Sequence, residues 1–206
     1  MPENQRAGFM WEENILDAVF QVRPGGYTDE HDCPKERNRF DPTENISIKT
    51  TGSGTLFLSD ALRVYDYSPN DKHTAIVVQY KQEEENRVLQ SVYELSLDNK
   101  SYLFGSVGRH EIEDLVQKIR SVPAGAPDTN TLREIHAMKK ELNSRSGVIR
   151  FNPKLDSSKQ RRLQCSIPKF IEYPSLIRSH TTQPILRGIA ILGQVAAGRR
   201  IRNRRV

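Results

Sequence analysis

The chain has 206 residues and a net charge of +5, and 36% of its residues are hydrophobic while 28% are charged. This composition is polar for a globular protein but too apolar for a disordered chain, and the length suits one compact domain with extensions. It excludes a membrane-spanning helix, because no run of eighteen apolar residues occurs, and a cysteine framework, because only Cys33 and Cys165 are present, far apart.

Helical and strand patterns alternate along the chain. Residues 9–22 place Ile15, Leu16 and Val19 on one face at helical spacing, and Glu12 shares that face. A polar loop with several acids is expected at 27–43, followed by a strand at 46–50 whose residues alternate between apolar and polar. Further predicted elements are a strand at 55–58, a helix at 61–65, a hairpin of strands at 74–80 and 88–97, helices at 109–121 and 131–143, and strands at 148–151 and 162–167.

These elements predict an α/β (α+β) fold with a central mixed β-sheet flanked by helices, and a basic C-terminal β-hairpin and helix. The apolar run that begins at Ile185 predicts the C-terminal helix, and the arginine cluster that starts at Arg199 follows it. Residues 145–206 hold fourteen Lys or Arg and two Asp or Glu, whereas residues 1–144 carry a net negative charge. We therefore predict a core with an acidic balance at 1–144 and a basic part that contacts DNA at 145–206, within the same domain.

The segment Glu44–Gly54, with the sequence ENISIKTTGSG, ends a short strand with Lys49. Alternation in a strand points Ser47 and Lys49 to the same face. Phosphodiester hydrolysis needs an activated water, and a divalent cation held by carboxylates together with a nearby lysine can provide it. Lys49 with the acids Glu12 and Asp32 is therefore a candidate catalytic group, and a solvated strand end is the alternative interpretation.

The order of these features resembles the PD-(D/E)XK nuclease superfamily: a helix with an acid, an acidic loop, and a strand that ends in a lysine before a Gly/Ser turn. NISIKTTGS is similar to the SxK-type strands of some type II restriction endonucleases, and the resemblance covers about residues 9–97. It implies that Glu12 is the helix acid, that Asp32 or else Asp29 is the strand acid, and that Lys49 is the catalytic lysine, with Ser47 where an acid normally stands.

The serine at position 47 departs from the family pattern, and no Pro-Asp dipeptide precedes the strand. Because serine is a weak neutral ligand, a bound metal would need a further oxygen from Glu44, Asp41 or the main-chain carbonyl of Ile48. The resemblance thus implies Mg²⁺ or Mn²⁺ as the cofactor. The implied metal ligands are Asp32, Glu12, Glu44 and Asp29.

A second group, made of Asp60, Gln79 and Lys81, could provide the active site within the same family. Gln79 and Lys81 share a strand face, and glutamine replaces the acid in some members of the superfamily. Lys81 begins the charged turn KQEEENR, however, which reads equally as a solvated hairpin tip.

Basic and amide side chains around the C-terminal hairpin match the chemistry of DNA contacts. Lysine and arginine neutralise phosphates, while arginine and glutamine can read base edges in the major groove. The candidate DNA-binding residues are Lys154, Lys159, Gln160, Arg161, Arg162, Gln164, Arg199 and Arg200.

Together these patterns favour a Mg²⁺-dependent, sequence-specific endonuclease for double-stranded DNA that acts as a homodimer in an intracellular compartment: the cytoplasm, or the nucleus or virion of a eukaryotic or viral source. The N-terminus shows no signal-peptide pattern. Two alternatives remain. One is a non-catalytic nucleic-acid-binding protein that uses the basic C-terminal third, and the other is a peripheral membrane or capsid-associated structural protein, although a membrane partner is not expected.

Overall fold

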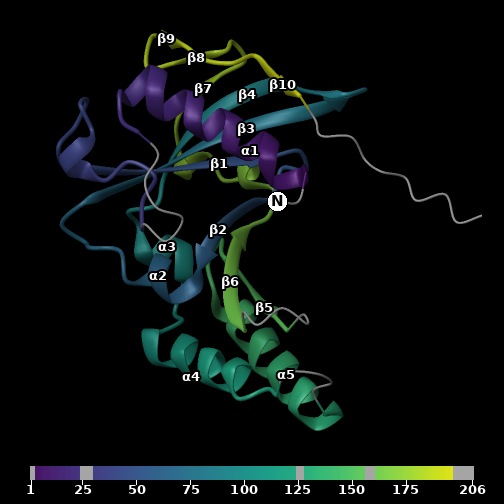
Figure 1. The fold of residues 1–206 in the computed structure, drawn as a ribbon. Helices are drawn as coiled ribbons and strands as arrows, with labels where there is room; N and C mark the ends of the chain where they lie inside the picture. Colours follow the sequence, from purple (N-terminus) through teal and green to yellow (C-terminus); the bar gives the residue numbers. More distant parts are fainter. Residues whose placement is uncertain (1–2, 24–29, 124–127, 156–160, 197–206) are drawn as a thin grey trace, which may run out of the picture. The chain divides into compact units, whose positions relative to one another are not determined.

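The computed structural model describes residues 3–23, 30–123, 128–155 and 161–196. They form a mixed α/β structure, as predicted, in two compact units, each built around one main sheet (Figure 1). The first unit is drawn from residues 1–54, 71–96 and 174–206, and the second from residues 55–70 and 97–173. Each unit contains residues from both sides of residue 144, where the acidic and basic parts of the sequence divide. The division by charge therefore does not coincide with the compact units.

The first unit is built on a five-stranded mixed sheet, which confirms the predicted strand at 46–50 and the predicted hairpin. Strand β1 (Glu44–Thr51) runs parallel to β3 (Lys72–Glu83), and β3 forms an antiparallel hairpin with β4 (Asn86–Ser96). Two C-terminal strands, β7 (Ile177–Thr181) and β10 (Gln194–Ala196), pair with opposite ends of β4. A short 3₁₀ turn, η2 (Lys35–Arg37), precedes β1.

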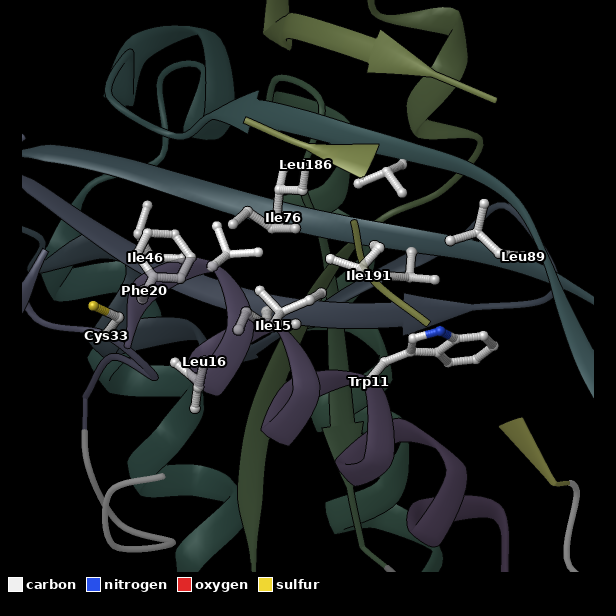
Figure 2. Packing of buried hydrophobic residues seen from close by; sticks show 14 of the residues in the cluster. Trp11, Ile15, Leu16, Phe20, Cys33, Ile46, Ile76, Leu89, Leu186 and Ile191 are labelled. Atoms are coloured by element: carbon white, nitrogen blue, oxygen red, sulfur yellow. The ribbon is translucent and has the colours of Figure 1, made fainter. Parts of the chain in front are cut away.

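One helix covers the apolar face of this sheet. The α-helix α1 (Glu3–Asn14) continues into a π-helical segment, η1 (Ile15–Phe20), and Gln21 ends it in a left-handed conformation with φ 58°. This confirms the helix predicted over residues 9–22 except for its last two residues. Figure 2 shows its apolar side chains packed against the sheet. The cluster consists of Trp11, Ile15, Leu16, Val19, Phe20, Cys33, Ile46, Ile48, Ile76, Val78, Leu89, Val92, Leu186, Ile191 and Val195.

The predicted C-terminal helix is wrong for residues 185–196. Strands β8 (Ile185–Leu186) and β9 (Ile189–Ala190) pair across a turn in which Arg187 and Gly188 have positive φ, and β10 follows. Two left-handed residues in succession cannot continue a helix. The extended chain still buries Leu186, Ile191 and Val195, because the indole of Trp11 donates to the carbonyl of Leu192 at 2.8 Å and ties this segment to α1.

The second unit combines a three-stranded antiparallel sheet with four helices. The sheet has the order β2–β6–β5, with β2 at Leu56–Asp60, β6 at Arg162–Ile167 and β5 at Arg150–Lys154. This confirms the predicted β5–β6 hairpin. Its helices are α2 (Ala61–Tyr65), α3 (Lys100–Phe104), α4 (Arg109–Arg120) and α5 (Thr129–Arg145), and its last turn is η3 (Phe170–Glu172); the turn η4 (Pro174–Leu176) belongs to the first unit.

Side-chain caps explain where the helices of this unit begin. The carboxylate of Asp60 accepts hydrogen bonds from the amides of Leu62 and Arg63 at the start of α2, and that of Asp128 accepts from the amide of Thr131 in α5. Such caps satisfy amides that lack partners within the helix. None of the helices within the described ranges is both long and apolar enough to cross a membrane.

Helix α3 and the residues just after it meet the connection between α5 and β5 at close range. The amide of Ser106 donates to the carbonyl of Arg145 at 3.2 Å, and the amide of Val148 donates to the carbonyl of Tyr102 at 3.2 Å. A Cβ atom on Gly147 would overlap that same Tyr102 carbonyl oxygen. Glycine at this position therefore allows two backbone segments to touch.

Candidate active site

The end of the acidic loop runs along the free edge of β1. Cys33 forms an isolated antiparallel bridge with Ile46, with backbone hydrogen bonds of 3.1 and 2.8 Å. This bridge places Asp32 beside the next part of the strand. Oδ2 of Asp32 accepts a hydrogen bond from the amide of Ile48 at 2.5 Å and lies 3.4 Å from Nζ of Lys49. Asp32 and Lys49 thus form an ion pair on the edge of β1.

Glu12 of α1 lies close enough to this ion pair for the charges of Asp32 and Lys49 to affect its pKa. The helix passes close to β1, since a Cβ atom on Gly8 would lie only 3.2 Å from Oγ1 of Thr50. Burial, together with the negative charge of Asp32, raises the pKa of Glu12 to about 7, although the positive charge of Lys49 lowers it. A carboxyl with this pKa is partly protonated at neutral pH, and a nearby cation would favour its ionised form.

Ser47 is the residue at which the sequence resemblance led us to expect an acid. It lies two residues before Lys49 on β1, opposite Ala75 of β3, and is 8% exposed. Its hydroxyl brings no negative charge to the site, so Glu12 and Asp32 supply the carboxylates.

The other carboxylates that the sequence suggested as ligands have different roles or fall outside the described residues. Oε1 of Glu44 accepts from Oγ1 of Thr74 at 2.6 Å, while Oε2 lies 2.8 Å from Nη2 of Arg187. Asp41 pairs with Lys72 at 2.6 Å, and hydrogen bonds from Lys72 and Thr43 lower its pKa. Asp29 lies outside the described residues. The carboxylate of Glu44 is therefore occupied by protein partners.

These findings define how a metal ion could be held. Within the described ranges, the side chains of His, Cys, Asp and Glu form no group of three or more that could bind a metal. Mg²⁺ does not require such a group, because it commonly keeps several waters and binds one or two carboxylates together with substrate phosphates. Asp32 and Glu12, whose pKa responds to the charge of Asp32, are the two carboxylates that could take this role.

A buried ion network around Glu44 was not predicted from the sequence. Glu44 is 5% exposed and contacts Arg178 at 3.2 Å as well as Arg187, which also pairs with Glu94 at 2.9 Å. Two basic residues of the C-terminal third thus neutralise buried acids of the sheet. No local signal marks them, because Arg187 is 143 residues from Glu44 in the sequence.

The second candidate group is explained by structural roles. Asp60 caps α2 through the amides of Leu62 and Arg63, and it belongs to the second unit. Lys81 belongs to the first unit, where its side chain is 68% exposed and lies 3.5 Å from Oε1 of Glu83. Gln79 is half-buried on β3.

The predicted DNA-binding residues differ in what they contact. Lys154 lies opposite Arg162 at the end of the β5–β6 hairpin, and Gln164 lies opposite Asn152. Arg161 instead donates to the carbonyls of Leu155 at 2.5 Å and Pro123 at 2.9 Å, so it supports the backbone. The structure does not describe Lys159, Gln160, Arg199 and Arg200.

Comparisons with known proteins do not help to interpret this site. Neither the family models, nor the curated proteins, nor the solved structures yield a match to the chain. A functional conclusion therefore depends on the chemistry of Glu12, Asp32 and Lys49.

Proposed function

We propose that this protein is a Mg²⁺-dependent endonuclease that hydrolyses phosphodiester bonds of duplex DNA. The meeting of Asp32 and Lys49 at the edge of β1, within the electrostatic reach of Glu12, carries the proposal. Three separate segments of the chain contribute these residues: α1, the loop before β1, and β1 itself. Two carboxylates beside a lysine are what hydrolysis of a phosphodiester requires when a metal ion completes the site.

Each side chain has a separate role in the proposed reaction. Glu12 and Asp32 would hold Mg²⁺, which when bound would polarise the phosphate and lower the pKa of water. The ion pair with Asp32 orients Lys49, whose ammonium group stabilises the charge that develops on the phosphate oxygens. The oxygen of one water bonds to phosphorus, the bond to one sugar oxygen breaks, and that oxygen takes up a proton.

The direct test is incubation of the full chain with supercoiled plasmid DNA and Mg²⁺ or Mn²⁺. We expect nicked or linear products, and none with EDTA. Discrete fragments would support sequence-specific, restriction-like cutting, and a homodimer in solution would suit two-fold symmetric sites. Absence of cleavage across varied metals and DNA sequences would overturn the proposal.

The excess of basic residues in the C-terminal third favours a second candidate, a nucleic-acid-binding protein without catalysis. Part of that charge is already used, because Arg178 and Arg187 neutralise Glu44. Binding that falls steeply with salt, without cleavage under any condition, would favour this candidate. The membrane or capsid alternative loses one of its supports, because residues 185–196 form strands β8, β9 and β10 instead of a helix. The arginine cluster that it also used lies outside the described residues.

A further inference from the structure

Helix α5 is the most exposed long element of the second unit. It has seventeen residues, and only Ile135 and Leu142 are buried. Two buried side chains stabilise a helix of this length only weakly, and specific hydrogen bonds at both of its ends add to that stability. Asp128 caps the first turn, and Oδ1 of Asn143 accepts from the amide of Phe151 at 2.8 Å. The helix is thus fixed to β5 while most of its surface faces solvent.

The exposed face opposite Ile135 and Leu142 carries a row of side chains that we call the α5 stripe. Its members recur at spacings of three and four residues, which places them on one side of a helix. They are Asn130, Arg133, His136, Ala137, Lys140 and Ser144, and all six are exposed. The stripe spans about 21 Å along the helix axis. It carries two cations, Arg133 and Lys140, and the exposed Glu141 lies on the same face, four residues after Ala137.

Both acids of α5 have a basic neighbour. Glu134 forms an ion pair with Lys118 of α4, and the exposed Glu141 lies 3.7 Å from Arg145, which also pairs with Glu111. Arg133 and Lys140, by contrast, form no ion pair with any acid in the described part of the chain. The positive charge of the stripe is therefore available to an anionic partner.

The hairpin that follows α5 carries further basic residues. Lys154 and Arg162 lie opposite each other at the end of the two strands where the connecting loop begins. Arg161 joins this end to the connection between α4 and α5 through the carbonyl of Pro123. The order of elements is a helix pair followed at once by a two-stranded hairpin, which Figure 1 shows as α4, α5, β5 and β6. The hydrogen bonds from Phe151 to Asn143 and from Arg161 to Pro123 thus hold the helix pair and the hairpin together.

We propose that α5 is a recognition helix that enters the major groove of duplex DNA, with Lys154 and Arg162 on the adjacent phosphates. The groove is about 12 Å wide and admits one α-helix. Arginine and asparagine are suited to guanine and adenine edges, and Ala137 and Ser144 leave room for close approach. The sequence predicted that residues of the hairpin read base edges in the major groove, whereas this proposal places α5 in that groove. This assignment does not depend on nuclease activity.

Duplex DNA fits this surface better than duplex RNA does. The major groove of an A-form helix is deep and narrow, so side chains on a helix cannot reach its bases. A helix with a row of exposed polar residues therefore selects the B-form duplex. An RNA duplex of the same sequence is the natural competitor in a test.

The experiment measures binding of the full chain to a labelled DNA duplex in EDTA, where a metal-dependent nuclease cannot cut. The double variant Arg133→Gln/Lys140→Gln should weaken binding by about tenfold or more and make the salt dependence shallower by about two units of slope. The matched control Arg39→Gln/Lys169→Gln removes equal charge from exposed positions outside α5 and the hairpin, and it should bind nearly as wild type does.

A second variant tests shape without changing charge. Ala137→Phe places a bulky side chain in the middle of the stripe and should also weaken binding, with an unchanged melting temperature. Equal losses in the α5 variant and its charge-matched control would overturn the proposal, as would unchanged binding of the α5 variants. Equal affinity for the RNA duplex would overturn the major-groove assignment. Because every measurement is made without metal, these outcomes are independent of whether the protein cuts DNA.

Discussion

Asp32 links the backbone of β1 to the side chain of Lys49. One carboxylate oxygen, Oδ2, accepts the amide of Ile48 at 2.5 Å and lies 3.4 Å from Nζ of Lys49. The amide on the free edge of a strand is ordinarily left to solvent. Here it positions a carboxylate, and that carboxylate in turn positions a lysine.

The lysine itself provides the sharpest test of the catalytic assignment. Lys49→Ala should lower the cleavage rate by about 10²–10⁴-fold and leave DNA affinity nearly unchanged, because the ammonium acts on charge that develops during reaction. Lys72→Ala is the matched control, since it removes another lysine paired with an aspartate in the same unit. Single-turnover cleavage and binding in EDTA give the two readouts. Normal cutting by Lys49→Ala would remove the residue from the mechanism.

The raised pKa of Glu12 predicts that the stability of the protein depends on pH in a specific way. Burial and the charge of Asp32 raise its pKa in the folded protein from the ordinary 4.5 to about 7. Between these values the folded state binds more protons than the unfolded state, so the free energy of unfolding falls as pH rises through this window. The stabilising contribution is complete below about pH 4.5 and lost above about pH 7.

Glu12→Gln should remove this contribution, because glutamine does not titrate. Urea denaturation at several pH values should show a shallower decline between pH 5 and 7 for the variant, by about one proton in the linkage slope at most. Glu13→Gln is the control, since Glu13 is exposed on the same helix. An unchanged pH profile in Glu12→Gln would show that the carboxyl ionises normally in the folded protein.

The same carboxyl should respond to a divalent cation. At a pH above 7, Mg²⁺ bound between Glu12 and Asp32 would stabilise the folded state by mass action. We expect a rise in melting temperature with Mg²⁺ for the wild type and for Glu13→Gln, and a smaller rise for Glu12→Gln. Equal shifts in all three proteins would show that the cation binds elsewhere.

Glu44 should behave as a structural residue. Its carboxylate is 5% exposed and bonded to Thr74, Asn38, Arg178 and Arg187. Glu44→Ala removes the acceptor that these four side chains share and leaves the positive charges of Arg178 and Arg187 less well compensated, so we expect a loss of about 3 kcal/mol in the free energy of unfolding. The exposed Glu85 provides the control, and Glu85→Ala should cost less than about 0.5 kcal/mol. A small loss in Glu44→Ala, measured by urea denaturation, would contradict the network.

Gly147 tests the contact between α3 and the connection from α5 to β5. A methyl group there overlaps the carbonyl oxygen of Tyr102, so Gly147→Ala should destabilise the protein by about 2 kcal/mol or more. Gly193→Ala is the comparison, because its added carbon would meet only Pro184 at ordinary contact distances of 3.7 and 3.8 Å. Thermal unfolding of both variants measures the difference. Similar melting temperatures would contradict the close approach.

Local patterns in the sequence were sufficient for most elements of the fold. The β-branched alternation at 46–50, the helix capped by Asp60 and the amphipathic helix at 109–121 are all present. Each depends on residues within a few positions of one another, so each can be read without tertiary information. The prediction of a C-terminal helix was wrong because the apolar residues of this segment lie in extended chain. They are buried through contacts with α1 and β4, which local sequence patterns do not reveal.

The sequence by itself determined which chemical groups this protein has: an acid on the first helix, acids in a loop, and Lys49 after Ser47 at a strand end. Only the tertiary structure decided which of them meet. It paired Asp32 with Lys49 and engaged Glu44 with arginines far along the chain. Such pairings follow from burial and from which distant segments share a sheet, and neither is encoded in the spacing of neighbouring residues.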